Sequence, residues 1–368
     1  MNVTAQTSGR RSNIELLRII AILMIVAHHF ALFSDLTYPA GTLSVSRFWV
    51  DLLLVGGKTG ACIYVLITGY FLVDSKSFKP SRIVKLWLQI FFYSVAIYLI
   101  LVGTGMIKFS FNDLLHSIFP ISFDQYWFAT TYFLLYLFYP FINVLINNLS
   151  KKQHLTLLLL FFVLLSVIPS LLDVSYILSY FVNFVFFYCI GGFIKRHVDM
   201  DKTPTGQCFA VAAILIVLTA ATPSIFSLAG TMNESIESYA YHFFGNTSLT
   251  VILIAVFLFT GTVNTKIRDN RLINIIAKSC FGIYLIHENP NLRSGLWLVL
   301  FKGAQYKNSL IIIPYSLLAT IIIFVSAALI ELLRIYLIEN RYSNLLTKMD
   351  QPLKRKWDSI MDKLAGKS

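Results

Sequence analysis

The chain has 368 residues, of which 57% are hydrophobic and 13% are charged, whereas about a quarter of the residues in an ordinary soluble domain are charged. This composition excludes a protein whose main solvent is water. The formal net charge of +12 does not indicate nucleic-acid binding, because the basic residues form short clusters between apolar runs and no continuous stripe. We expect a lipid bilayer as a partner and no nucleic acid.

Apolar segments long enough to cross a bilayer recur along nearly the whole chain, and they predict an all-α bundle of about ten membrane-spanning helices. In chain order the predicted spans are 13–33, 60–73, 83–102, 126–146, 155–172, 177–194, 209–228, 248–263, 273–287 and 310–338. The second, eighth and ninth are short, which predicts that neighbouring helices shield them or that they break near a cavity. The first is expected to remain a helix rather than a cleaved signal, since Glu15 and Arg18 lie inside it.

Lysines and arginines assign the sides of the membrane, because cytoplasmic connections carry an excess of them. With the N-terminus inside, 23 of the 30 lie on the cytoplasmic side or at its edge, and Arg18 lies within the membrane. The six left for the outer side are Arg47, Lys58, Lys108, Arg293, Lys302 and Lys307. We therefore predict that both termini are cytoplasmic.

Two segments follow from this topology: a membrane domain over 1–338 and a basic cytoplasmic tail over 339–368. The tail is predicted to be partly an amphipathic helix on the anionic inner leaflet. Its apolar residues at helical spacing are Leu345, Leu346, Met349, Leu353 and Trp357.

The four cysteines show no metal-ligand spacing, so we expect them only to pack and predict no metal site. They are Cys62, Cys189, Cys208 and Cys280. Nucleophile-elbow, metalloprotease, P-loop and dinucleotide motifs are also absent from the sequence, which gives hydrolase and nucleotide-driven pump functions no support.

The first predicted helix carries four ionisable residues, Glu15, Arg18, His28 and His29. Such groups are costly inside a membrane unless they are paired or wetted, which makes them functional candidates. Arg18 and His29 differ by about 20° in direction and about 16 Å in height, so they share one face, while His28 points about 80° away toward a neighbouring helix. Alternatively, Arg18 pairs with Glu15 or snorkels, and the histidines are structural.

The shared face suits a long donor with its charged head in the cytosol and its reactive end in the membrane. An arginine provides a permanently charged fork for a phosphate-bearing donor. An imidazole deeper in the membrane suits a general base that takes a proton from an acceptor hydroxyl.

The run NIELLRIIAILMIVAHHF, residues 13–30, resembles the opening helix of the integral-membrane acyltransferase-three family, whose signature is an arginine, ten intervening residues and a histidine. The resemblance implies that His29 is the catalytic histidine, that Arg18 helps to position or bind an acyl-coenzyme A (acyl-CoA) donor, and that Glu15 is the usual upstream acidic residue. Four further runs agree in order: YVLITGYFLV, YWFATTYFLLYLFYPF, FFYCIGGFIKR and KSCFGIYLIHENPNLRSGLW.

The last of these runs departs from the commoner family ending and is more similar to Gram-positive members that modify surface polysaccharides. His287 and Glu288 are therefore expected to contact the acceptor or to orient the reacting group, or else to cap the helix at the interface. We place Trp127 and Tyr284 with them on the acceptor side. Trp127, together with Tyr126 and Tyr132, either stacks on a sugar or lipid carrier or belongs to an aromatic belt.

Arg82 and Lys85 are assigned to the donor-binding group, with the positive-inside signal as their alternative explanation. These residues and the family resemblance together imply an O-acyltransferase in a bacterial plasma membrane. It moves an acyl group, expected to be acetyl, from acyl-CoA to a hydroxyl of a surface or lipid-linked polysaccharide, with no bound cofactor. An exporter of polysaccharide or lipid-linked sugar is the alternative, since broken helices and midplane polar residues are also transporter features. A membrane scaffold is a third.

Overall fold

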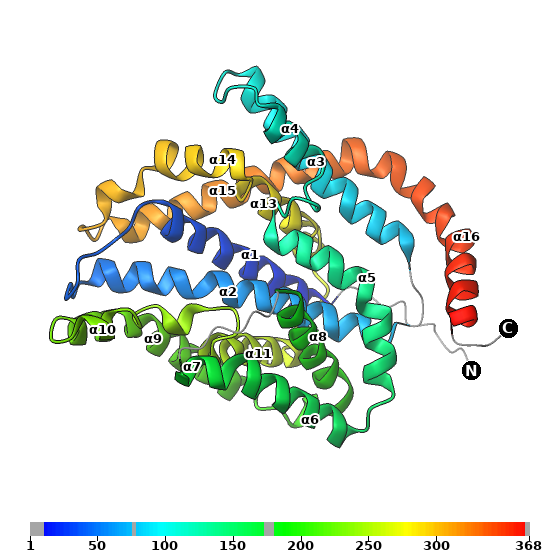
Figure 1. The fold of residues 1–368 in the computed structure, drawn as a ribbon, viewed down its shortest axis with the longest axis horizontal. Helices are drawn as coiled ribbons and strands as arrows, with labels where there is room; N and C mark the ends of the chain where they lie inside the picture. The colour runs from blue at the N-terminus through cyan, green and yellow to red at the C-terminus, as the bar shows by residue number, and fades with distance from the viewer. Residues whose placement is uncertain (1–10, 76–78, 173–179, 365–368) are drawn as a thin grey trace.

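The structure is a computed structural model that describes residues 11–75, 79–172 and 180–364. It is all-α, and no strand occurs in these ranges (Figure 1). The helices are α1 (Ser12–Phe33), α2 (Val45–Leu72), α3 (Pro80–Gly103), α4 (Phe111–Ile118), α5 (Trp127–Asn147), α6 (Lys151–Phe162), α7 (Ile168–Leu172), α8 (Tyr180–His197), α9 (Thr205–Gly230), α10 (Glu234–Glu237), α11 (Leu249–Asn264), α12 (Arg271–Ile276), α13 (Cys280–His287), α14 (Pro290–Ser294), α15 (Ile312–Arg334) and α16 (Asn340–Leu364).

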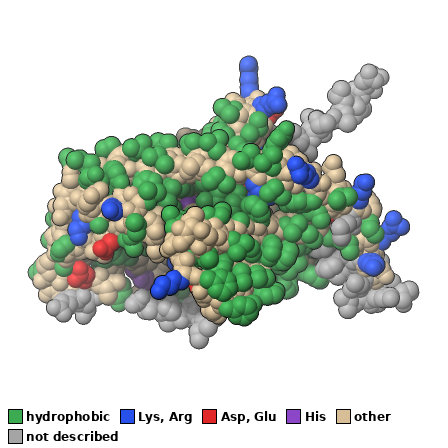
Figure 2. All heavy atoms as spheres, turned by 90° about the horizontal axis from the view of Figure 1, so that it is seen from above, with side chains coloured by type: hydrophobic (Ala, Val, Ile, Leu, Met, Phe, Trp, Pro, Cys, Tyr) green, Lys and Arg blue, Asp and Glu red, His purple; other side chains and the backbone are tan. Residues whose placement is uncertain are grey.

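Eight helical stretches of the described chain are long and apolar enough to cross a membrane. They are Ser12–Phe33, Val45–Leu72, Pro80–Gly103, Trp127–Asn147, Lys151–Leu171, Thr205–Gly230, His242–Asn264 and Ile312–Lys348. Hydrophobic side chains cover much of the face in Figure 2, and lysines and arginines are scattered singly or in small groups, several of them near the end that carries α16. The protein is thus a helical multi-pass membrane protein.

The predicted spans 177–194 and 273–287 are not among these eight. The first coincides with α8, except for residues 177–179, which lie outside the described part. The second is interrupted, because α12 gives way to a 3₁₀ turn at Ala277–Ser279 before α13 begins. This break was expected for a short span near a cavity. Ten spans remain a prediction.

The second helix corrects one predicted boundary. It begins at Val45, with Ser44 as its N-cap, so most of the expected outer loop before residue 60 is helical. Arg47 and Asp51 lie in this added part, one turn apart and buried, with Arg47 Nε 3.7 Å from Asp51 Oδ2. Arg47 also donates hydrogen bonds to Ser227 Oγ and to the carbonyl of Pro223 in α9.

Helices α1 and α2 pack side by side at the centre of the bundle (Figure 1). Glycines allow their backbones to approach, as small residues do in other membrane bundles. A Cβ on Gly60 would lie 2.7 Å from the carbonyl oxygen of Ala21, and one on Gly57 would lie 2.2 Å from Cγ of His28. Close packing therefore fixes the face that α1 presents to its neighbours.

The C-terminal helix α16 packs against α3. The backbone NH and the hydroxyl of Ser81 both donate hydrogen bonds to the carboxylate of Asp350, at 2.9 and 2.7 Å. Asp350 thereby supplies negative charge at the N-terminal end of α3, where the helix dipole favours it. Residues 1–10 and 365–368 and the side chains of Met349 and Trp357 are not described, and binding of the tail to the inner leaflet stays a prediction.

Candidate active site

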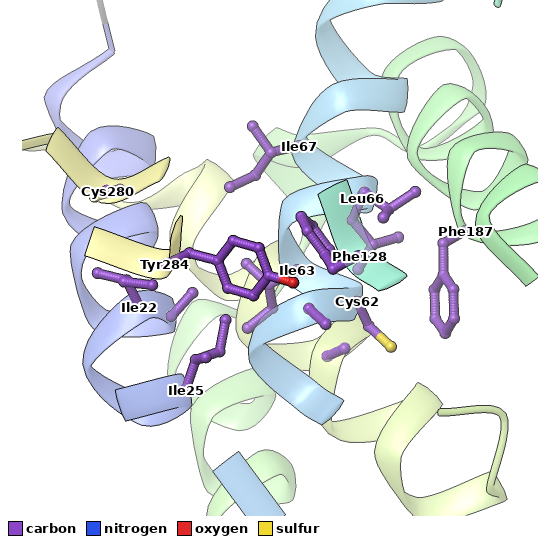
Figure 3. Packing of buried hydrophobic residues seen from close by; sticks show 14 of the residues in the cluster. Ile22, Ile25, Cys62, Ile63, Leu66, Ile67, Phe128, Phe187, Cys280 and Tyr284 are labelled. Carbon is purple, nitrogen blue, oxygen red and sulfur yellow. The ribbon is translucent and has the colours of Figure 1, made fainter. Parts of the chain in front are cut away.

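A cavity of about 240 Å³, here called the outer cavity, lies between α1, α2, α5 and α13. Its polar and aromatic wall includes His28, His29, Lys58, Tyr64, Trp127, Tyr180, Tyr284, Glu288 and Arg293. Figure 3 shows Tyr284 reaching from α13 toward α2, with Ile22 and Ile25 of α1 on one side and Phe128 of α5 on the other. Three of the four residues assigned to the acceptor side, Trp127, Tyr284 and Glu288, therefore line one cavity with His29.

His29 is hydrogen-bonded to the fourth, His287, although α1 and α13 are far apart in sequence. Its Nδ1 lies 2.8 Å from His287 Nε2 and 3.3 Å from Glu288 Oε2. The other oxygen of that carboxylate accepts a hydrogen bond of 2.9 Å from Nη1 of Arg293. His287, Glu288 and Arg293 all come from the segment that follows the break between α12 and α13.

Hydrogen bonding fixes the tautomers of this histidine pair. His287 Nδ1 lies 2.6 Å from the carbonyl oxygen of Ile283, and a carbonyl only accepts, so this nitrogen carries the proton. In a neutral His287 the Nε2 atom is then an acceptor, and His29 Nδ1 must donate to it. Nε2 of His29 is left with a free lone pair, which is the requirement for a general base.

His28 has a different environment. Its Nδ1 is 2.8 Å from the carbonyl oxygen of Leu54, and its ring packs against Gly57. The prediction that His28 faces a neighbouring helix is confirmed. His28 thus helps to join α1 to α2, and its Nε2 also keeps a lone pair, so the feature that distinguishes His29 is the contact of its Nδ1 with His287 and Glu288.

A second cavity of about 460 Å³ lies toward α16 and is called the inner cavity. Arg18, Arg82 and Lys85, the three residues assigned to the donor, all line it. Arg18 Nη1 is 3.5 Å from Glu15 Oε2, and its side chain is 30% exposed, so the guanidinium remains open to a ligand. The expected local pair with Glu15 is therefore present beside a cavity.

Arg82 and Lys85 are not equivalent. Lys85 Nζ lies 2.5 Å from Glu339 Oε1, whereas Arg82 makes a 3.4 Å contact with the hydroxyl of Tyr136. Glu339 also accepts from Arg334, which makes two further 2.8 Å hydrogen bonds to Glu331. Much of the charge of Lys85 is thus neutralised, and Arg82 is the freer cation.

The two cavities share four wall residues, Tyr64, Phe128, Cys280 and Phe281, here called the neck. Tyr64 comes from α2, Phe128 from α5, and the other two from the first turn of α13. The hydroxyl of Tyr64 donates a 2.7 Å hydrogen bond to the carbonyl oxygen of Arg18. Arg18 and His29 therefore lie on opposite sides of a neck, not on the wall of a single cavity.

Sequence reasoning missed several groups of this site. Lys58 and Arg293 were counted only as outer-side charges, and the neck residues and the cluster of Glu331, Arg334 and Glu339 were not singled out. The available signal for Lys58 was the run GGKTG. Glycines inside a membrane helix indicate close packing against another helix rather than a loop, so a lysine among them is held inside the bundle. In the described chain, no group of three or more His, Cys, Asp or Glu side chains is arranged to hold a metal ion.

Two adjacent cavities between membrane-crossing helices, with cations beside one and a histidine pair beside the other, define a multi-pass membrane protein with an internal site. The chain belongs to the acyltransferase-3 family, because the model of that family's acyltransferase domain matches residues 11–332. The protein is thus a membrane acyltransferase, and the resemblance seen in residues 13–30 is confirmed. No curated protein sequence and no solved structure matches the chain.

Proposed function

We propose that the protein transfers an acyl group, expected to be acetyl, from acyl-CoA to a hydroxyl of a surface or lipid-linked polysaccharide in a bacterial plasma membrane. The observation that carries this proposal is the neck, the four residues that line both the cavity of Arg18 and the cavity of His29 and so place the two cavities next to each other. A nucleotide head held by cations in the inner cavity leaves its pantetheine arm free to enter the neck. The thioester then reaches the level of His29.

Arg18 and Arg82 bind donor phosphates in this proposal, because a guanidinium matches the geometry of phosphate oxygens. Glu15 orients Arg18 through their ion pair. Lys85 contributes less while Glu339 holds it. The predicted cytoplasmic side of this cavity is where acyl-CoA is available.

In the chemical step, Nε2 of His29 takes the proton of the acceptor hydroxyl while that oxygen attacks the thioester carbonyl. The tetrahedral intermediate collapses as the carbon–sulfur bond breaks, and the sulfur leaves with the proton returned by the His29 imidazolium. The products are an ester and free coenzyme A, with no covalent acyl-enzyme. His287 accepts the hydrogen bond from Nδ1 of His29, and the nearby carboxylate of Glu288 stabilises the positive charge of the imidazolium during the transfer.

The test is chemical analysis of O-acyl groups on surface polysaccharide from cells with the wild-type gene, a deletion, His29→Ala or His29→Gln. We expect the acyl groups to disappear in the deletion and in both variants. His154→Gln is the matched control, since His154 is also buried but binds the carbonyl of Cys189 away from both cavities. Unchanged acylation in the deletion would remove the proposal, and a His29→Gln protein that still modifies the glycan would favour transport.

A further inference from the structure

Lys58 carries a cation into the outer cavity without a partner in the described chain. It lies on α2, and its Nζ is 4.7 Å from the centroid of the Trp127 ring. Among the described residues, no carboxylate lies within ion-pair distance of this ammonium and no hydrogen bond to it is formed. A face-on aromatic ring offsets only part of the cost of removing an ammonium from water.

The charges of the outer cavity do not balance. Its charged wall residues are Lys58, Arg293 and Glu288. Glu288 is bound to Arg293 through one oxygen, while its other oxygen lies 3.3 Å from His29 and has no hydrogen-bond partner among the described residues. With the histidines neutral, the cavity holds two cations and one carboxylate, so one further anion completes the pairing.

Aromatic rings lie beside the ammonium. The ring centroids of Trp127 and Tyr180 are 4.9 Å apart, and both residues line the outer cavity. Trp and Tyr combine a large apolar face with a polar tip, which suits the mixed apolar and polar surface of a sugar ring. The same wall thus offers a platform for a ring and a charge for one of its substituents.

Donor phosphates do not account for Lys58. The cations assigned to them, Arg18 and Arg82, lie in the inner cavity on the other side of the neck. An anion at Lys58 must therefore belong to the molecule that enters the outer cavity.

We propose that the outer cavity selects an acceptor sugar that carries a negative charge, with Lys58 as its counter-ion and Trp127 and Tyr180 as its platform. The anion is a carboxylate or a phosphate on the glycan, and its binding places a neighbouring hydroxyl beside His29. This inference rests on the proposed function for the identity of the acceptor, but the charge selection is a binding property. Lys58 is in this sense a specificity-determining residue.

The experiment measures saccharide binding to purified full-length protein in nanodiscs of zwitterionic lipid, without acyl donor. The probes are a glucuronic-acid-containing disaccharide, its carboxyl-reduced counterpart with the same rings, and a disaccharide bearing a 6-phosphate. The wild type is expected to bind at least one charged probe about tenfold more tightly than the reduced one, the size of a charge-assisted hydrogen bond. Lys58→Gln should remove this difference, and Lys58→Arg should retain it.

Lys108→Gln is the matched control, because Lys108 is an exposed cation of the predicted outer side that lines neither cavity. It should leave every affinity unchanged, and coenzyme A should bind all four proteins equally. Equal binding of charged and reduced saccharides by the wild type overturns the inference, as does an equal loss of both in Lys58→Gln. Displacement of the charged probe by phosphatidylglycerol added to the nanodiscs would assign the cation to a lipid headgroup and also overturn it.

Failure of this inference can be told apart from failure of the proposed function. If the protein binds charged saccharides selectively but transfers no acyl group, the inference is supported and the proposed function is contradicted. If the protein transfers acyl groups to charged and reduced saccharides with equal kcat/KM, the proposed function is supported and the inference is contradicted. A Lys58→Gln protein that loses kcat on every acceptor would assign Lys58 to the reaction itself. That result would also contradict the inference.

Discussion

His29 of α1 and His287 of α13 share a hydrogen bond of 2.8 Å across 258 positions of sequence. The bond sets the tautomer of neutral His29 and leaves its Nε2 unprotonated. Because Glu288 Oε2 lies 3.3 Å from the same Nδ1 without a hydrogen bond to it, it can replace His287 only in part.

His287→Ala should lower kcat for acyl transfer by roughly 10²-fold or less, below the loss in His29→Ala, since a general base contributes about 10²–10⁴-fold. The affinity for coenzyme A should not change, because His287 lies on the other side of the neck from Arg18. Steady-state kinetics with a defined acceptor measure both quantities. His287→Gln, which retains an acceptor, should recover part of kcat, and equal activity of His287→Ala and wild type would show that the hydrogen bond has no catalytic part.

Arg82 and Lys85 are predicted to differ in their effect on donor binding. Arg82→Gln should weaken coenzyme A binding about tenfold or more, because a hydrogen bond to a charged group contributes about 1.5–3 kcal/mol. Lys85→Gln should weaken it less than about threefold, since Glu339 already pairs with Lys85. Titration of coenzyme A into nanodiscs at low and high salt checks this, and the Arg82 effect should shrink with salt. A larger loss in Lys85→Gln than in Arg82→Gln would contradict the assignment.

Gly57→Ala should destabilise the protein, because its Cβ would lie 2.2 Å from Cγ of His28. Overpacking of this kind costs about 1–3 kcal/mol. Gly206→Ala is the control: nothing lies within 4 Å of a Cβ there, and alanine is the better helix former by up to about 1 kcal/mol. Thermal unfolding in detergent should show a lower midpoint for Gly57→Ala and an unchanged or higher one for Gly206→Ala. Equal midpoints would mean that α1 and α2 have room to separate.

The helical fold was predictable because apolar length is a local property of the sequence. The beginning of α2 was not, because Arg47 and Asp51 lower the apolar character of that segment. Both are buried and satisfied partly by groups distant in sequence, Ser227 and Pro223 of α9 and the turn residue Tyr241. A hydropathy window covers only neighbouring residues, so it cannot detect hydrogen-bond partners that are this distant in sequence.

The candidate site was likewise predictable from the sequence only in part. The placement of Arg18 and His29 on one face of α1 was predictable because eleven residues make three helical turns to within about 20°. The bond from His29 to His287 and the four-residue neck come from contacts between helices, which no spacing along one helix predicts. Lys58 was assigned to a loop because the helix was expected to begin after it.

Cys280 provides a probe of the neck. In a protein with Cys62, Cys189 and Cys208 replaced by alanine, methyl methanethiosulfonate should modify Cys280 slowly, because this side chain is 2% exposed, and should abolish acyl transfer by narrowing the neck. Bound coenzyme A should slow the modification several-fold if its arm enters between Tyr64 and Phe281. Mass spectrometry of the intact protein follows the reaction.

Adenosine 3′,5′-bisphosphate, which has the charged head but no pantetheine arm, is the control ligand for this labelling. It should occupy the cations of the inner cavity and leave the rate at Cys280 unchanged, because nothing would then fill the neck. Equal protection by both ligands would mean that the head alone closes the access path. No protection by either at saturating concentration would mean that the donor does not reach the neck, and the thioester would then have no path to His29.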